Sequence, residues 1–146
     1  MEREIINPTN EELFDMMCGK PEYDVTDWEL KYESVIRVTM QDIDDILTTA
    51  FEGGITYWCD EVKVDGDYLG EYASEQVSRG GALYLHEMED DRYHYLCLND
   101  ILYGLKLYLQ NKTDIILDGG IDTCNVDADI ADQIVQYAIF KEIVYG

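Results

Sequence analysis

An excess of acidic side chains constrains this chain more than any other feature. The sequence holds 32 Asp and Glu residues against 10 Lys and Arg residues, a formal net charge of −22 at pH 7. A folded domain with this excess repels itself, so we expect the charge to serve something other than folding. Apolar residues still make up 47% of the chain, and 12 residues are tyrosine. Disordered acidic chains lack such side chains, so this chain is predicted to fold.

A chain of 146 residues is expected to form one domain, over 1–146, with a core large enough to need no disulfide or metal. No apolar run approaches the ~18 residues of a membrane span. The polar start is unlike a signal peptide. The cysteines never form a C-x-x-C pair, which favours reduced thiols in a cytosolic protein; the alternative is two disulfides in a secreted domain. They are Cys18, Cys59, Cys97 and Cys124.

Apolar periodicity and capping residues predict the helices. Thr39, followed by Asp42 at the third position, is expected to begin a helix that ends at the glycine pair 53–54. Asn99 is expected to cap a helix that runs to about residue 110, and Asp127 a final helix. Two shorter helical segments are predicted over 8–18 and 72–77.

Runs of β-branched and aromatic residues predict the strands. The clearest pair is a hairpin, 82–88 and 92–98, joined by three acidic residues. Further strands are predicted over 34–38, 55–64 and 115–117, whereas 20–33 is mixed and polar with Trp28 as its expected anchor. The apolar segment 143–146 is expected to be tucked into the body. This order lacks a βαβ rhythm and predicts an α+β fold, a small antiparallel sheet packed by three or four helices.

The acidic residues gather in three clusters, within 42–52, 60–91 and 114–132. Each cluster alone is typical of a solvated face or of carboxylates at a helix N-terminus. A stretch this acidic is not expected to bind DNA, RNA or an anionic membrane directly, and its natural partner is a basic protein. Carboxylates on a folded surface can also imitate duplex phosphates and compete for a basic groove.

Two segments resemble metal sites. His86 and His94 lie on the predicted hairpin, where Glu87 and Asp91 could complete a ligand set. Neither histidine belongs to a spaced ligand motif, so we interpret both as sheet-surface residues. The segment 118–129 is rich in oxygen ligands but departs from the EF-hand spacing, and we interpret it as a turn and a helix cap. No metal is expected.

No motif names a reaction. The thiols of Cys59 and Cys97 have no neighbouring base in the sequence, and acidic surroundings raise a thiol pKa. The chain has no Walker A loop, no G-x-G-x-x-G and no G-x-S-x-G. No carboxylate pair stands out as general acid and base. We therefore expect no cofactor and no enzymatic activity.

Tyrosines are frequent in and near the most acidic region. Tyrosine combines apolar area with a hydroxyl group and is favoured at interfaces. Sheets also favour aromatic residues for their own packing, so both interpretations stay open. The residues concerned are Tyr68, Tyr72, Tyr84, Tyr93 and Tyr95.

Two segments resemble a family of small proteins carried by bacteriophages and mobile elements. The first is Glu52–Trp58, which reads E-G-G-I-T-Y-W, and the second runs from Asp127 to Gly146 and contains I-V-Q-Y and E-I-V-Y-G. The family has no assigned catalytic residues, so none is carried over. The resemblance implies a phage accessory protein that acts in the cytoplasm of a bacterial host.

The acidity and the resemblance together predict a binding protein. We expect it to bind and inhibit a basic host protein, such as a CRISPR effector or a restriction enzyme, through an acidic surface in the manner of a DNA mimic. The tyrosine and apolar content is also compatible with a homodimer. The expected contact residues are Asp42, Asp44, Asp45, Glu52, Asp60, Glu61, Asp65, Asp67, Glu71, Glu87, Glu89, Asp90, Asp91, Tyr68 and Tyr72.

Two alternatives are weighed against this hypothesis. The first is a sponge for a small nucleotide defence signal, which needs arginine or lysine in its pocket and aromatic rings to stack on the base. Its candidate residues are Arg37, Arg79, Arg92 and Tyr93, and the negative field of the chain opposes it. The second is an enzyme of unrecognised type, which no constellation of residues supports.

Overall fold

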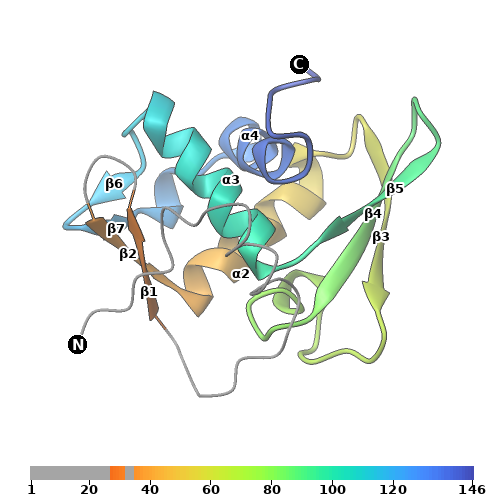
Figure 1. The fold of residues 1–146 in the computed structure, drawn as a ribbon, viewed down its shortest axis with the longest axis horizontal. Helices are drawn as coiled ribbons and strands as arrows, with labels where there is room; N and C mark the ends of the chain where they lie inside the picture. The colour runs from red at the N-terminus through yellow and green to blue at the C-terminus, as the bar shows by residue number, and fades with distance from the viewer. Residues whose placement is uncertain (1–26, 32–34) are drawn as a thin grey trace.

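The computed structural model describes residues 27–31 and 35–146, so the predicted helix 8–18 lies outside the described residues. Helices and strands are mixed along the chain, which confirms the α+β class. The strands form two separate sheets and not the single antiparallel sheet that we expected. Figure 1 shows the three longer helices in the middle of the molecule, with one sheet at the left and the other at the right.

The first sheet has four short strands in the spatial order β1-β2-β7-β6. They are β1 (Asp27–Lys31), β2 (Val35–Thr39), β6 (Ile116–Leu117) and β7 (Gly120–Ile121). β1 and β2 are antiparallel, whereas β2 and β7 are parallel and pair at Arg37 and Gly120. Trp28 is buried, as expected of an anchor, and residues 27–31 around it form a strand that the polar composition did not predict.

The second sheet has three antiparallel strands in the order β3-β4-β5. They are β3 (Cys59–Asp65), β4 (Ala82–Glu87) and β5 (Arg92–Leu96). The β4–β5 pair confirms the predicted hairpin, with Leu83 opposite Leu96 and Glu87 opposite Arg92. A bulge interrupts the β3–β4 register between Cys59 and Glu61.

Helix α2 (Met40–Thr49) begins at the predicted capping box. The Thr39 hydroxyl accepts from the Asp42 N–H at 3.1 Å, and the Asp42 carboxylate accepts from the Thr39 N–H at 2.9 Å. The helix continues into η1 (Ala50–Gly54), a π-helical turn that ends at the predicted glycine pair. An added Cβ at Gly54 would lie 2.7 Å from the Ala128 carbonyl oxygen, so only glycine permits this close approach.

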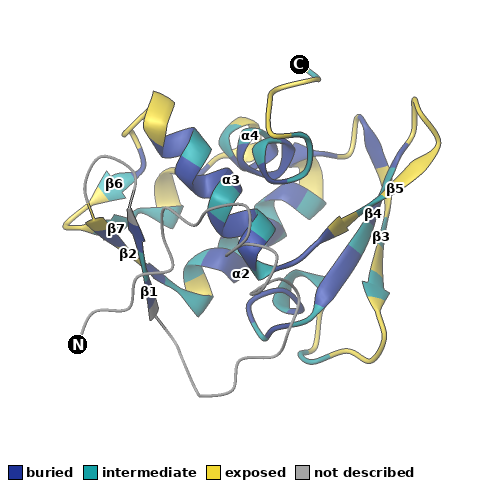
Figure 2. Cartoon of the chain, viewed as in Figure 1, coloured by how far each residue is buried: buried dark blue, intermediate teal, exposed yellow. Residues whose placement is uncertain are grey.

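Helices α3 (Leu98–Asn111) and α4 (Ala128–Phe140) cross closely in the middle of the molecule. At Gly104 an added Cβ would lie 2.5 Å from the Ile134 carbonyl oxygen. Figure 2 shows that the sides of the helices turned to the interior are buried. α4 begins at Asp127 as predicted, but α3 begins two residues earlier than predicted. The Asp100 carboxylate caps the Cys97 N–H at 3.1 Å, and Asn99 is a buried helix residue.

The sequence predicted a strand over 55–64, but the segment 55–58 forms a turn and the strand begins only at Cys59. The Ile55 carbonyl accepts from the Trp58 N–H at 3.1 Å and from the Cys59 N–H at 2.8 Å. The side chains of Ile55 and Trp58 are buried by this turn, so the apolar run reflects core packing and not strand pairing.

Two further short helical turns join these elements, η2 (Ala73–Glu75) and η3 (Thr123–Asn125). The predicted helix 72–77 is reduced to η2 and the turns after it. Within the part of the chain that the structure describes, no helix combines the length and apolar character that crossing a bilayer demands.

Candidate functional site

One side of the β3-β4-β5 sheet faces away from the helices. Strand alternation directs Val62, Leu83 and Leu85 toward the core and leaves polar and aromatic side chains on the other side. We call this side the open sheet face. Its members are Glu61, Lys63, Asp65, Tyr84, His86, Tyr93 and Tyr95.

Hydrogen bonds hold the tyrosines of the open sheet face in place. The Tyr93 hydroxyl donates to Glu61 at 2.6 Å, and the Tyr95 hydroxyl donates to Asp65 at 2.9 Å. The rings of Tyr84 and Tyr95 lie 5.1 Å apart, a distance typical of a favourable aromatic pair. Tyr93 remains 54% exposed. The face therefore presents hydrogen-bonded aromatic rings beside carboxylates, a combination suited to a protein interface.

His86 lies between two carboxylates of this region. Its Nδ1 is 2.6 Å from Asp60 and its Nε2 is 2.7 Å from Asp91. Both nitrogens donate when the ring is doubly protonated, so the hydrogen bonds to Asp60 and Asp91 raise the pKa of His86. The hairpin register sets His86 opposite Tyr93 and His94 opposite Leu85, which puts the two histidines on opposite sides of the sheet. They therefore do not share a metal site.

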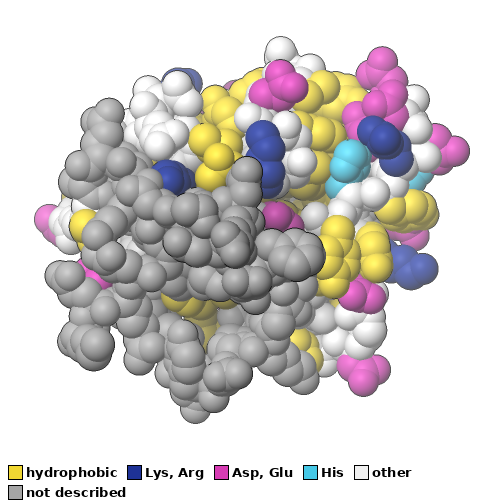
Figure 3. Space-filling view, viewed as in Figure 1, with side chains coloured by type: hydrophobic (Ala, Val, Ile, Leu, Met, Phe, Trp, Pro, Cys, Tyr) yellow, Lys and Arg dark blue, Asp and Glu magenta, His cyan; other side chains and the backbone are white. Residues whose placement is uncertain are grey.

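The hairpin tip extends the acidic surface beyond the open sheet face. In Figure 3 carboxylates gather at the outer end of the β4–β5 hairpin, next to a basic side chain and a histidine. Most predicted contact residues are exposed, but they are spread over this tip, the open sheet face, η1 and the loop that follows β3 at the opposite end of the sheet. The exposed ones are Glu52, Asp60, Glu61, Asp65, Asp67, Tyr68, Glu71, Tyr72, Glu89, Asp90 and Asp91.

Glu87 is a correction to the predicted contact surface. It is only 3% exposed, on the core side of β4. Its carboxylate accepts from the Tyr145 hydroxyl and lies 2.7 Å from His94 Nε2. Burial by itself would raise the pKa of Glu87, but the hydrogen bonds from Tyr145 and His94 outweigh it and lower the pKa. Residues two apart on a strand point to the same side, so the apolar Leu83 and Leu85 indicate that Glu87 also faces the core.

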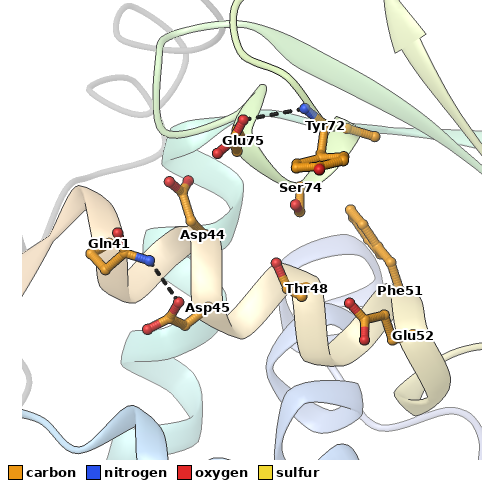
Figure 4. A pocket seen from close by; sticks show the side chains of 10 residues that line it. Gln41, Asp44, Asp45, Thr48, Phe51, Glu52, Tyr72, Ser74 and Glu75 are labelled. Carbon is orange, nitrogen blue, oxygen red and sulfur yellow. Dashed lines mark hydrogen bonds between the residues drawn. The ribbon is translucent and has the colours of Figure 1, made fainter.

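A groove of about 410 Å³ lies between α2 with η1 on one side and the segment 72–75 on the other. Figure 4 shows Asp44 and Asp45 toward one end of this groove and the rings of Phe51 and Tyr72 toward the other end. The ten lining residues are Gln41, Asp44, Asp45, Thr48, Phe51, Glu52, Tyr72, Ala73, Ser74 and Glu75. Phe51 is partly buried and also packs against the core, and no local pattern in the sequence indicates that it lines a groove together with Tyr72.

The carboxylates of the groove differ in how far they are already engaged. Asp44 is buried, accepts from the Ser78 hydroxyl at 2.6 Å and pairs with Arg79 at 3.4 Å. Burial raises its pKa despite these partners. Glu75 accepts two backbone N–H groups through one oxygen, and these bonds lower its pKa. Asp44 therefore lines the groove as a buried carboxylate paired within the fold, and the prediction that it is an exposed contact residue is wrong.

The carboxylates of Asp42 and Asp45 also accept hydrogen bonds from within the chain. Asp42 completes the capping box of α2. The Asp45 carboxylate accepts from the Gln41 amide at 2.7 Å and from the Thr123 hydroxyl at 3.1 Å. Glu52 is exposed at the end of the groove. Within the predicted cluster 42–52, Glu52 is therefore the carboxylate best placed to meet a partner.

The two segments of the phage-family resemblance pack against each other. Asp132 of α4 accepts from the Tyr57 hydroxyl at 2.6 Å and from the Trp58 indole N–H at 2.8 Å. The Gln136 amide donates to Asp132 at 2.9 Å and accepts from the Tyr145 N–H at 2.8 Å. We call these five residues the tail network, and their common role is structural.

The C-terminal segment 143–146, expected to be tucked into the body, packs against the core through one partly buried side chain. Tyr145 stacks on Trp58 with a centroid distance of 5.6 Å. Ile143 and Val144 are 38% and 50% exposed, so they are not tucked into the body.

The arginines proposed for a nucleotide pocket lie on different elements. Arg37 is on β2 in one sheet, Arg92 begins β5 in the other sheet, and Arg79 follows η2. Arg79 is paired with Asp44. The structure does not bring the three together with Tyr93 into one site.

The remaining candidates also take structural roles. Burial raises the pKa of the Cys59 thiol to about 11, a larger effect than its acidic neighbours exert. In the segment 118–129, Asp127 caps α4 by accepting from the Ile130 N–H at 2.9 Å. Among the residues that the structure describes, no three His, Cys, Asp or Glu side chains are grouped to hold a metal ion. Cys59 and Cys124 are free thiols.

No family model, curated protein or solved structure matches this chain.

Proposed function

We propose that this protein binds a basic protein of a bacterial host and inhibits it, acting in the host cytoplasm as a phage accessory protein. The observation that supports this proposal is the open sheet face, where hydrogen-bonded tyrosines stand beside carboxylates. The phage-family resemblance of Glu52–Trp58 and of the C-terminal segment supports the cellular context. The proposed targets are defence effectors and nucleic-acid-handling enzymes, because their binding grooves carry the opposite charge.

The electrostatics favour a basic partner over a second copy of the chain. A net charge of −22 steers basic proteins toward the surface and accelerates their association. Two copies of the open sheet face would place carboxylates against carboxylates, which costs free energy. Tyrosines then supply the apolar contact area that charge alone lacks, since aromatic residues dominate interface hot spots.

Capture from a host lysate tests the proposal. The full chain is immobilised, exposed to bacterial lysate at low salt, and washed with ~0.5 M sodium chloride, at which exposed charge pairs are screened. We expect one basic protein to be retained at low salt and released by the wash. Its nucleic-acid-binding or cleavage activity, measured with and without the added chain, is expected to fall.

Two triple variants provide the matched comparison. Glu61→Gln, Asp65→Asn and Glu89→Gln remove three charges from the open sheet face and the hairpin tip. Asp118→Asn, Asp129→Asn and Glu142→Gln remove three exposed charges from other elements. We expect the first variant to lose the partner and the second to retain it. Equal loss in both, or a target whose activity is unchanged, would contradict the proposal.

A further inference from the structure

We propose that the groove between α2 and the segment 72–75 receives an arginine side chain of the basic partner protein. This inference rests on the proposed function and adds the chemistry of one contact. It starts from the shape of the groove, continues with its charge, and ends with the preference for arginine over other cations.

Aromatic rings border one end of the groove from both sides. Phe51 rises from η1 and Tyr72 comes from the opposite segment, as Figure 4 shows. Tyr72 is 60% exposed although its ring borders a hollow of about 410 Å³. An aromatic face left in water at the edge of a hollow gains free energy when a flat or apolar group covers it. The hollow is also wide enough for a side chain rather than for a bare ion.

Charge complementarity selects a cation for this hollow. The lining includes Asp44, Asp45, Glu52 and Glu75, and none of the described residues that line it is Lys or Arg. Arg79 contacts Asp44 but is not part of the lining. Carboxylates accept about four hydrogen bonds each, so the bonds already made inside the fold leave acceptor positions open. A positively charged group therefore finds both acceptors and an unbalanced negative field here.

The geometry favours a guanidinium group over an ammonium group. A guanidinium is planar, so it can stack on the Tyr72 or Phe51 ring while its N–H groups reach the carboxylates. Its fork of donors suits a carboxylate better than the point charge of lysine does. The apolar part of an arginine side chain can also cover the aromatic rings. The partner segment is therefore expected to present an exposed arginine.

Nuclear magnetic resonance of the full chain tests the groove with defined probes. Three blocked tripeptides, Gly-Arg-Gly, Gly-Lys-Gly and Gly-citrulline-Gly, are titrated separately into the labelled protein. Citrulline is the uncharged counterpart of arginine. We expect the arginine peptide to shift the amide signals of Thr48, Phe51, Tyr72 and Ser74 in a saturable manner. The lysine and citrulline peptides are expected to bind at least about fivefold more weakly. The lysine ammonium is charged but not planar, and the citrulline side chain is planar but uncharged.

Variants with equal charge locate the binding. Glu52→Gln removes one exposed carboxylate of the groove, whereas Glu142→Gln removes one exposed carboxylate elsewhere. We expect the first to weaken arginine-peptide binding about threefold or more and the second to leave it nearly unchanged. Equal affinity for the three peptides, shifts spread over all acidic surfaces, or equal effects of the two variants would overturn the inference.

The outcome is separable from that of the proposed function. If the arginine peptide fails to bind while the full chain still captures and inhibits a basic host protein, the groove inference is wrong and the proposed function stands. If the peptide binds the groove but no basic protein is captured, the groove recognises arginine and the proposed function is wrong.

Discussion

The open sheet face and the tail network are built from the same kinds of side chain and differ in burial. On the open sheet face Tyr93 donates to Glu61, and the ring stays 54% exposed. In the tail network Trp58 donates to Asp132, and both residues are at least 93% buried. An exposed hydrogen bond is exchanged with water at little cost, whereas a buried donor without its acceptor is costly. Burial therefore decides which carboxylates stabilise the fold and which remain available to a partner.

The largest difference between the two regions is expected from removing one carboxylate in each. Asp132→Ala leaves the Trp58 and Gln136 donors buried without their acceptor, so the free energy of unfolding is expected to fall by about 3 kcal/mol. Asp67→Ala, at an exposed position, is expected to change it by less than about 0.5 kcal/mol. Urea denaturation measures both. Similar losses for the two variants would show that burial does not separate the regions.

Removing one hydroxyl in each region repeats the comparison with a smaller change. Tyr145→Phe takes a donor from the buried Glu87 carboxylate, with an expected loss of about 1–2 kcal/mol. Tyr93→Phe takes a donor from the exposed Glu61 carboxylate, with an expected loss of at most about 0.5 kcal/mol. Thermal and urea unfolding of the two variants give the values. A larger loss for Tyr93→Phe would reverse our assignment of roles.

The pH dependence of stability sharpens the comparison at His86. Asp60 and Asp91 raise its folded pKa above the unfolded value, so its contribution is fully present below about pH 6.5 and is lost as pH rises through the folded pKa. We expect His86→Gln to destabilise the protein more at about pH 5.5 than at pH 8.5. The imidazole signals of His86, followed by NMR through the same range, report the pKa directly. A folded pKa below that of free histidine would contradict the contacts with both carboxylates.

The smallest effect is expected when charge is removed from the open sheet face without removing its hydrogen bonds. Glu61→Gln keeps an oxygen that can accept from Tyr93 and relieves part of the self-repulsion of a chain with net charge −22. We expect the free energy of unfolding to stay the same or to rise by a few tenths of a kcal/mol. The urea midpoint measures this change. A clear loss of stability would mean that the charge at Glu61 serves the fold rather than a partner.

Local signals in the sequence predicted the elements whose ends depend on nearby residues. The capping box of Thr39 and Asp42, the cap at Asp127 and the β4–β5 hairpin are confirmed. In each of these, the deciding contacts join residues a few positions apart. Where two local caps competed, at Asn99 and Cys97, the prediction was two residues late because Asp100 caps Cys97.

Local sequence patterns did not predict the features that depend on contacts between residues far apart in the chain. The segment 55–58 has the β-branched and aromatic composition of a strand, but Asp132, 74 positions after Trp58, accepts its indole N–H in the folded chain. The groove between α2 and the segment 72–75 likewise needs Phe51 and Tyr72 on two elements that only the tertiary structure brings together. The sequence shows where the acidic residues cluster. It does not show which of their carboxylates form hydrogen bonds or ion pairs within the fold.

Gln136 holds the end of the chain through main-chain atoms. Its amide oxygen accepts from the N–H groups of Val144 and Tyr145, each at 2.8 Å, and its amide nitrogen donates to the Tyr145 carbonyl at 3.1 Å. All these hydrogen bonds join Gln136 to main-chain atoms, so they do not depend on which side chains residues 144 and 145 carry. They fix the path of the tail without fixing the residue types at its exposed positions. Substitutions at Ile143 and Val144 are therefore expected to leave the course of the tail unchanged, as long as glutamine is kept at position 136.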